Sequence, residues 1–352
     1  VLQYGDVLMR FEHQVMAEIA DHGPMRFSQF VEAALYDPDS AFYTTSGRAG
    51  GRQGDFVTSA EVGPLFAAVV ADWLDGVWRS FGEPDVFRVC EVGAGVGTLF
   101  RGINRASPAC FSALNYTLVE RSASMQVAHQ SLPSEAWKSG TAFPEQRQHV
   151  VMANELLDNL SFDIAERVTN GWALVHVGVV GEKLRLQVGP ADLELNYLSG
   201  LAPDADCGTR VPVALQACEW VEHVRANADR VLAFDYAAST AELARRDQAG
   251  WLRTYFGHQR ASNPLVDPGQ RDITHDVPID QLPPADEQHL QADWLNLHGL
   301  PERVEAARQT WTERAHIGDL QAMAARSAIG EAKALTDPTG LGAFLVLEWR
   351  GV

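Results

Sequence analysis

Hydrophobic and polar positions alternate with two different periods along this chain. Leu65, Val69, Trp73 and Val77 recur at four-residue steps, which predicts an amphipathic helix over 65–78. Short apolar runs of strand length come next and are separated by stretches that suit helices. These runs are 87–92, 116–120, 149–153 and 230–236. The alternation predicts an α/β fold with a mainly parallel sheet that helices cover on both faces.

The pattern divides the chain into a helical N-terminal region, a core in two pieces and an inserted lobe. These parts are 1–85, then 86–159 with 230–352, and 160–229. The lobe is predicted from a β-hairpin over 172–180 and 183–188, followed by a helix over 212–226. In the N-terminal region, a helix is expected to end at Asp37-Pro38, because the residue before a proline disfavours the α-conformation.

The last third of the chain has a weaker pattern. Residues 257–287 contain several prolines, and we expect a long loop there that is functional or disordered. A charged, alanine-rich stretch over 301–328 predicts one helix, and 342–349 predicts a closing strand.

The segment after the first apolar run is the most informative. Glu91-Val92-Gly93-Ala94-Gly95-Val96-Gly97 places Gly93, Gly95 and Gly97 at a predicted strand-to-helix turn, where a missing Cβ lets the backbone approach a ligand. A dinucleotide fingerprint needs its third glycine where Thr98 stands, which disfavours an NAD site. An acidic residue two positions before the first glycine resembles the first motif of S-adenosylmethionine (SAM)-dependent methyltransferases. The motif therefore indicates SAM as the cofactor.

Two glutamates extend this candidate cofactor site. Glu120 ends the second strand, where its oxygens can accept hydrogen bonds from ribose hydroxyls; an exposed acid at a strand end is the alternative. Glu91 is expected to lie deeper, beside the cationic methionyl end of SAM, which would give a buried carboxylate a partner. For Glu91, the alternative is a role in backbone capping.

Asn154-Glu155-Leu156-Leu157-Asp158 follows the third strand, and ligands of open α/β sheets sit at the carboxyl ends of strands. Asn154, Glu155 and Asp158 are therefore the candidate catalytic residues. Two carboxylates three residues apart can share one face of a helical turn and orient a guanidinium through paired hydrogen bonds. For Asp158 alone, capping of a helix is an equal alternative.

The composition of the chain argues against several classes of partner. The formal net charge is −18, and such a chain repels a phosphate backbone, so no nucleic-acid partner is expected. No apolar run approaches the ~20 residues that span a bilayer, and we expect no membrane insertion and no signal peptide. The four cysteines lack C-x-x-C spacing, so no metal site is expected and a cytoplasmic location is favoured.

Several segments occur together in an order that resembles the MidA-like family of SAM-dependent methyltransferases. These segments are 30–38, 42–43, 54–62, 91–99, 119–122, 154–160, 234–236 and 268–277. That family includes the mitochondrial complex I assembly factor that methylates an arginine of a complex I subunit. The resemblance runs from about residue 27 to the C-terminus and implies the class I, Rossmann-like methyltransferase fold.

The resemblance also implies which residues form the site. It implies SAM contacts at Glu91, Gly93, Gly95, Gly97 and Glu120. It further implies that the cleft is lined by Asp55, Thr58, Glu61, Asn154, Glu155 and Asp158, with the first three on the cofactor side. The N-terminal region would contribute to this active-site cleft, and the stretch around His258 with 268–277 would cover it. Independently of the family, Thr58 or Ser59 with Glu61 predicts a capping arrangement at a helix start.

The chain also departs from the family pattern. Val96 stands where an arginine is usual, and Gly102 stands where an acidic residue is usual. The favoured function is methyl transfer to an arginine of a partner protein, with a respiratory-complex subunit as a candidate partner and a homodimer as a candidate assembly. A non-catalytic SAM-binding assembly factor and a small-molecule methyltransferase remain as alternatives, and an NAD oxidoreductase ranks last.

Overall fold

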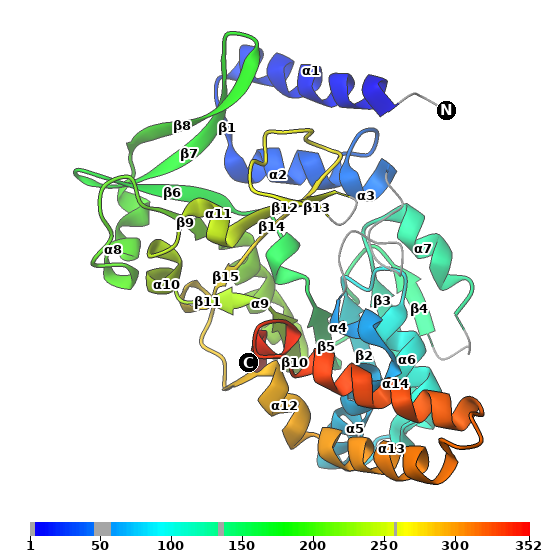
Figure 1. Ribbon diagram of the computed structural model, residues 1–352. Helices are drawn as coiled ribbons and strands as arrows, with labels where there is room; N and C mark the ends of the chain where they lie inside the picture. Colours follow the sequence, from blue (N-terminus) through cyan, green and yellow to red (C-terminus); the bar gives the residue numbers. More distant parts are fainter. Residues whose placement is uncertain (1–3, 46–57, 133–136, 257–258) are drawn as a thin grey trace.

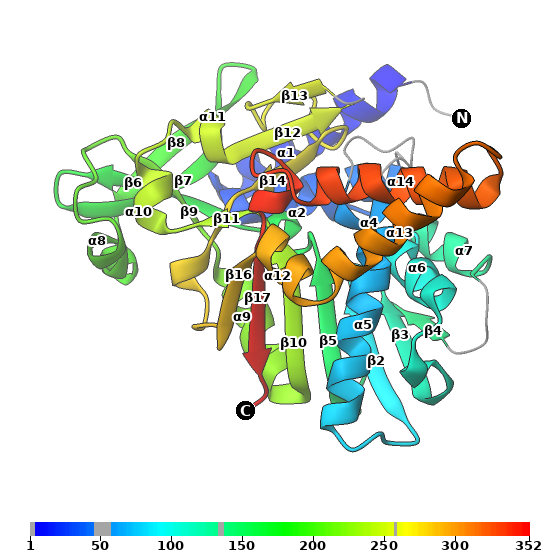
Figure 2. The same ribbon diagram turned by 60° about the horizontal axis from the view of Figure 1, so that its bottom comes forward.

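The largest sheet of the protein has seven strands in the order β16-β17-β10-β5-β2-β3-β4. The computed structural model describes residues 4–45, 58–132, 137–256 and 259–352. Strands β4, β3, β2, β5 and β10 run parallel, while β17 is antiparallel to both of its neighbours (Figure 2). The strands are β2 (Phe87–Val92), β3 (Leu114–Val119), β4 (Trp137–Gly140), β5 (Gln148–Asn154), β10 (Ala228–Asp235), β16 (Glu287–Leu290) and β17 (Leu345–Arg350). The expected mainly parallel sheet is confirmed.

Both faces of this sheet are buried, so successive side chains of one strand enter different cores. On β2, Val89 packs with α5 (Pro64–Ser80) and α6 (Thr98–Ala106), whereas Cys90 packs with α9 (Leu215–Asn227) on the opposite face. A strand that is covered on both faces has apolar residues at nearly every position. The central strands therefore lie within two residues of the predicted runs.

The C-terminal helices cover the same face as α5. They are α12 (Gln291–Leu297), α13 (Leu300–Arg314) and α14 (Leu320–Leu335), and α13 and α14 lie next to one another in Figures 1 and 2. The prediction of one helix over 301–328 is therefore wrong. Gly318 adopts a left-handed φ of 66°, and the Asp319 side chain caps α14 by accepting a hydrogen bond from the Ala322 N–H. Good helix formers such as alanine, glutamate and arginine occur on both sides of this turn, so the pattern did not reveal the break.

A second sheet joins the N-terminal helices to the segment between β5 and α9. Its strands are β1 (Met25–Arg26), β6 (Asp163–Val168), β7 (Gly171–Val180), β8 (Lys183–Ala191) and β9 (Arg210–Val213). The predicted hairpin is confirmed as β7–β8, with Gly181 in its turn at a φ of 63°. Helices α1 (Tyr4–His22) and α2 (Phe27–Tyr36) pack on this sheet through Phe11, Phe30 and Val177 (Figure 1). The helix expected from residue 212 begins at Leu215, because the residues before it form β9.

The proline-rich stretch over 257–287 is not one long loop in its described part. Strands β13 (Gln259–Ala261) and β14 (Asp272–His275) pair with β12 (Leu252–Phe256). All four residues of β14 are buried, and three of them are polar, so the strand has no hydrophobic alternation to detect. The prolines lie outside these three strands and did not exclude them.

The remaining elements are short. They are α3 (Phe42–Thr45), α4 (Ser59–Val62), α7 (Ala123–His129), α8 (Leu198–Leu201), α10 (Thr240–Ala244), α11 (Gln248–Trp251), β11 (Ala237–Ala238) and β15 (Val277–Pro278). The 3-10 helices are η1 (Ala109–Ala113), η2 (Leu157–Asn159), η3 (Leu193–Tyr197), η4 (Ile279–Gln281) and η5 (Leu341–Ala343). Helix α2 ends at Tyr36, directly before Asp37-Pro38, as predicted.

Candidate functional site

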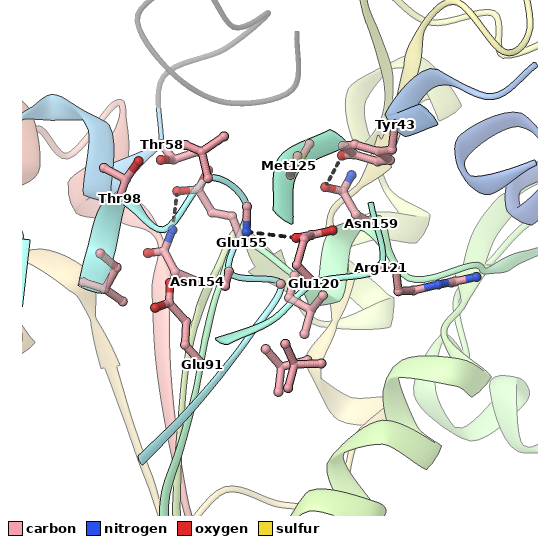
Figure 3. Close-up of a pocket in the computed structure, with 18 of the residues that line it drawn as sticks. Tyr43, Thr58, Glu91, Thr98, Glu120, Arg121, Met125, Asn154, Glu155 and Asn159 are labelled. Carbon is pink, nitrogen blue, oxygen red and sulfur yellow. Dashed lines mark hydrogen bonds between the residues drawn. The ribbon is translucent and has the colours of Figure 1, made fainter. Parts of the chain in front are cut away.

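A cavity of about 330 Å³ opens at the carboxyl ends of β2, β3 and β5. This edge of a parallel sheet is where ligands of open α/β folds bind. Eight of the predicted site residues line it: Thr58, Glu61, Glu91, Gly93, Gly95, Glu120, Asn154 and Glu155. Figure 3 shows most of the labelled polar side chains gathered around one space.

The three glycines of the turn share a left-handed backbone but differ in what a side chain at each position would meet. All have left-handed φ angles, which are 71° at Gly93, 53° at Gly95 and 78° at Gly97. A Cβ on Gly93 would lie 2.9 Å from Leu156 Cδ1, and one on Gly97 would lie 2.9 Å from Leu132 Cδ1. A Cβ on Gly95 would meet nothing within 4 Å. Gly95 is therefore the glycine whose Cβ would project into open space, while Gly97 packs against the protein and does not line the cavity.

Glu120 is tied to the glycine turn from the end of β3. Its Oε2 accepts a hydrogen bond from the Gly95 N–H at 2.9 Å (Figure 3). Its Oε1 accepts one from the Ser122 N–H at 2.8 Å. Burial raises the pKa of this carboxyl above its ordinary value. Each oxygen keeps a second lone pair, so the group can still accept hydrogen bonds from a ligand.

Glu91 is 4% exposed and is the most buried of the four glutamates that line the cavity. Its Oε2 accepts a hydrogen bond from the Tyr116 hydroxyl at 2.7 Å. Burial raises the pKa of Glu91 to about 8, because the charged form is poorly solvated there. A cationic ligand beside this carboxyl would restore its ionised form.

Glu155 and Asn154 stand side by side at the end of β5. Glu155 has a left-handed φ of 53°, and its Oε1 accepts a hydrogen bond from the Ser59 N–H at 2.9 Å. The same oxygen accepts a hydrogen bond from Asn154 Nδ2 at 3.3 Å (Figure 3). Burial raises the pKa of Glu155 to about 8. Asn154 Oδ1 is buried and has no hydrogen-bond partner within the described ranges.

Asp158 does not line this cavity, so the expectation that it faces the same space as Glu155 is not met. Its Oδ2 instead accepts hydrogen bonds from the hydroxyls of Tyr236 and Thr274. The two acids do not share a helical face, because Glu155 has a left-handed backbone and only Leu157–Asn159 forms a short 3-10 helix. Asp158 is 1% exposed and is held inside the protein.

The predicted cap at the start of α4 is confirmed. The Thr58 N–H donates to Glu61 Oε2 at 3.4 Å, and both residues line the cavity. Asp55 and His258 lie outside the described residues. The expected cover over 268–277 does not line the cavity; Asp272 in that segment accepts a hydrogen bond from Asn159 Nδ2 at 3.4 Å and thus supports the lining from behind.

Other lining residues were not predicted as site residues. They are Tyr36, Tyr43, Met125, Thr141, Phe143, Asn159, Trp220 and His223, among others. The Tyr36 and Tyr43 rings stack with centroids 5.4 Å apart, and the Arg121 guanidinium lies 4.1 Å from the Tyr36 centroid. Both tyrosines lie in segments that carry the family resemblance, which was a usable signal. The aromatic residues Phe143 and Trp220 come from distant elements and carry no local motif.

The cavity is strongly acidic. Carboxyl groups of Glu61, Glu91, Glu120 and Glu155 line it. The Arg121 guanidinium is already paired with Glu32, and its side chain extends away from Glu120 in Figure 3. A ligand that carries positive charge is therefore favoured over an anionic one.

A family model described as "Putative S-adenosyl-L-methionine-dependent methyltransferase" matches residues 69–297. The chain belongs to this family. The MidA-like resemblance is thereby confirmed, and SAM is the cofactor of this methyltransferase family.

Known relatives agree with this assignment. The mitochondrial protein arginine methyltransferase NDUFAF7 homolog of Drosophila melanogaster is 25% identical over 304 residues, which cover 75% of this chain and 67% of that protein. NDUFAF7 of Mus musculus is 25% identical over 312 residues, which cover 76% and 67%. A crystal structure of a COG1565 superfamily member from Burkholderia thailandensis bound to S-adenosyl-homocysteine matches with a TM-score of 0.84 and 24% identity, covering 99% of this chain and 95% of that one. The Rossmann-like methyltransferase fold is thus confirmed.

The residues of this methyltransferase fit the cofactor. The open space in front of Gly95 lets a ligand approach the backbone, and the unpaired Asn154 Oδ1 can accept a hydrogen bond. SAM carries an ammonium and a sulfonium, and burial has raised the pKa values of two lining carboxyls, Glu91 and Glu155. Charges of this kind return such carboxyls to the ionised state.

Two other features are absent from the described residues. No described helix combines the length and the apolar character needed to cross a membrane. In the same ranges, no three side chains of His, Cys, Asp or Glu are grouped so that they could hold a metal ion.

Proposed function

We propose that this protein transfers a methyl group from SAM to an arginine side chain of a partner protein. The observation that carries the proposal is the Glu155 carboxyl, whose pKa is raised to about 8 at the end of β5, within the same cavity as the glycine turn. The named activity of the NDUFAF7 relatives supports an arginine acceptor. The S-adenosyl-homocysteine bound by the Burkholderia protein supports the cofactor.

The chemistry requires a group with the properties of Glu155. Arginine is protonated at neutral pH and is a weak nucleophile. Bound SAM supplies a methyl group on a positively charged sulfur, so the protein mainly orients the nucleophile. The Glu155 carboxylate would accept a hydrogen bond from the guanidinium and then take its proton. The balance closes, because the methylated guanidinium keeps its positive charge, the sulfonium becomes a neutral thioether, and one proton is left for Glu155.

We further propose that SAM lies along the glycine turn. Glu91 would be beside the methionyl ammonium, Gly93 and Gly95 would face the methionyl chain, and Glu120 would bind the ribose hydroxyls. All four residues line the same cavity, which supports this placement. Thr58 and Glu61 would lie at the transferred methyl group with Asn154, and Gly97 and Asp158 would act by holding the turn and the strand end in place.

The proposed parts of the chain contribute separately to the cleft. The N-terminal region, 1–85, supplies Tyr36 and Tyr43, and the inserted lobe, 160–229, supplies Trp220 and His223. The core, 86–159 with 230–352, supplies the glycine turn and the carboxyls. The cleft is therefore complete only when all three parts of the chain are folded together.

A labelling experiment tests the function. The protein is incubated with methyl-labelled SAM and lysate of the host, and labelled material is analysed by mass spectrometry. We expect methylarginine in a protein band, and a loss of at least about 100-fold in transfer for Glu155→Gln with SAM binding retained. The matched control is Glu348→Gln, because Glu348 is also a buried carboxyl with a raised pKa but lies on β17 outside the cavity.

The other outcomes decide between the alternatives. Full transfer by Glu155→Gln to the same acceptor would remove Glu155 from the mechanism. A labelled small molecule without a labelled protein would favour a small-molecule methyltransferase. SAM binding without any methylated product would favour a non-catalytic assembly factor, which is the alternative suggested by Val96 at a position where the family usually has arginine.

A further inference from the structure

A buried histidine outside the cavity lining is hydrogen-bonded to the glycine turn. His129 is the last residue of α7, is 1% exposed and does not line the cavity. Its Nε2 lies 2.8 Å from the Gly95 carbonyl oxygen, and its Nδ1 lies 2.7 Å from Ser139 Oγ on β4. The imidazole therefore connects the edge strand of the sheet to the central glycine of the turn.

The partners determine where the protons lie. The Gly95 carbonyl can only accept, so His129 Nε2 carries a hydrogen and donates it. Burial lowers the pKa of His129, which favours the neutral ring. In the neutral ring Nδ1 is an acceptor, and the Ser139 hydroxyl donates to it.

Gly95 is consequently held by both of its backbone polar groups. Its carbonyl accepts from His129, and its N–H donates to Glu120 Oε2 at 2.9 Å. Ser139 donates to His129 and His129 donates to Gly95, so these two hydrogen bonds polarise one another through the imidazole ring. The bond from the Gly95 N–H to Glu120 belongs to the preceding peptide group, so the two peptide groups that meet at Gly95 are each held by one hydrogen bond.

This restraint acts where the backbone is otherwise least restricted. Gly95 has a φ of 53°, and no atom lies within 4 Å of the position a Cβ would take. Glycine has the widest range of backbone conformations, so packing alone does not fix the peptide planes on either side of it. If Gly95 rotated, its N–H would leave Glu120, and the carboxylate would lose one of its two orienting hydrogen bonds.

We propose that His129 is a positioning residue for SAM binding, which acts through Gly95 to hold the glycine turn and Glu120 in the binding geometry. The inference rests on the proposed placement of SAM at Gly95 and Glu120. His129 touches neither the cofactor nor the acceptor, so its loss should raise the KM for SAM and leave kcat nearly unchanged. Loss of one buried hydrogen bond predicts SAM binding that is weaker by about five- to tenfold.

The test compares two substitutions of the same residue by calorimetric titration with SAM. His129→Leu removes both hydrogen bonds and should show the full loss. His129→Gln can place an amide N–H near the former Nε2 and should recover most of the affinity. The matched control is His149→Leu, because His149 is also hydrogen-bonded to the backbone, accepting at Nδ1 from the Arg88 N–H at 2.9 Å, but lies at the start of β5 and does not line the cavity.

Ser139→Ala is the second variant in case His129→Leu does not fold. Ser139 is exposed, so its truncation is tolerated, and removal of its hydroxyl should weaken SAM binding by about two- to threefold. Unchanged affinity in His129→Leu would overturn the inference, and so would unchanged affinity in Ser139→Ala where His129→Leu does not fold. It would also be overturned if His129→Gln bound no better than His129→Leu, or if His149→Leu lost as much. A wild-type protein that does not bind SAM would instead refute the placement of the cofactor.

Discussion

Glu91 should make the stability of the empty protein depend strongly on pH. Burial raises the pKa of this carboxyl from 4.5 to about 8. Below pH 4.5 the group is neutral in both the folded and the unfolded chain, so it has no effect. As the pH rises, the unfolded chain ionises first, and stability falls until the pH passes the folded pKa near 8.

The size of the effect follows from the difference in pKa. Each pH unit between the two values is worth about 1.4 kcal/mol, so the free energy of unfolding should fall by roughly 3–5 kcal/mol across the window. Glu91→Gln removes the titration, while its amide oxygen can still accept the hydrogen bond from Tyr116. The substitution itself changes the free energy of unfolding by an amount that does not depend on pH. It therefore does not affect the slope of stability against pH.

The assay is urea unfolding of both proteins at pH 5, 6, 7 and 8 without SAM. We expect the stability of Glu91→Gln relative to the wild type to increase by about 1 kcal/mol for each pH unit. The control is Glu18→Gln, because Glu18 is exposed and its removal should leave the slope unchanged. Parallel stability profiles for the wild type and Glu91→Gln would refute the assignment of a buried, proton-binding carboxyl.

Three further outcomes are expected. With SAM, Glu91→Gln should bind at least about tenfold more weakly by calorimetry, because a charge-assisted hydrogen bond to the cation is lost; equal affinity would contradict the proposed placement. Gly97→Ala should lower the free energy of unfolding by about 1–3 kcal/mol in urea, since its Cβ would lie 2.9 Å from Leu132 Cδ1 at a left-handed φ of 78°. Gly76→Ala should raise it by up to about 1 kcal/mol, since Gly76 is in helix α5 and a Cβ there meets nothing within 4 Å; destabilisation by this change would contradict the packing.

Much of the core could be predicted because strands that are buried on both faces have apolar residues at nearly every position. Strands β10, β5 and β2 in the centre of the sheet are of this kind and appear in the sequence as apolar runs. Strand β4, by contrast, has the sequence Trp137-Lys138-Ser139-Gly140 at the sheet edge, with no residue fully buried. An edge strand of this kind is polar and short, and nothing in its sequence distinguishes it from a loop.

The site was predictable where it depends on strand ends and not where it depends on tertiary assembly. Glu120 ends a predicted strand and Glu155 comes just after one, and both were found for that reason. Glu91 lies inside a predicted strand and was found from its position two residues before Gly93. Trp220 reaches the cavity from a helix that belongs to a different part of the chain. The prediction placed Asp158 in the cavity wrongly, because the left-handed φ of Glu155 changes the direction of the chain. A left-handed conformation is rare for a residue other than glycine and could not be predicted from the sequence.

The pairing of β1 with β7 has a consequence for the synthesis of this protein. Met25 pairs with Val177, and Arg26 Nε donates to Asp163 Oδ2 at 3.1 Å, so the first helices are completed by residues that leave the ribosome much later. Until then the apolar face of α2 that includes Phe30 has no sheet to cover it. Nascent chains should therefore expose this face and depend on chaperones for longer than the order of their helices suggests. The N-terminal helices are thus synthesised first, but they reach their final packing only after β6 and β7 have been made.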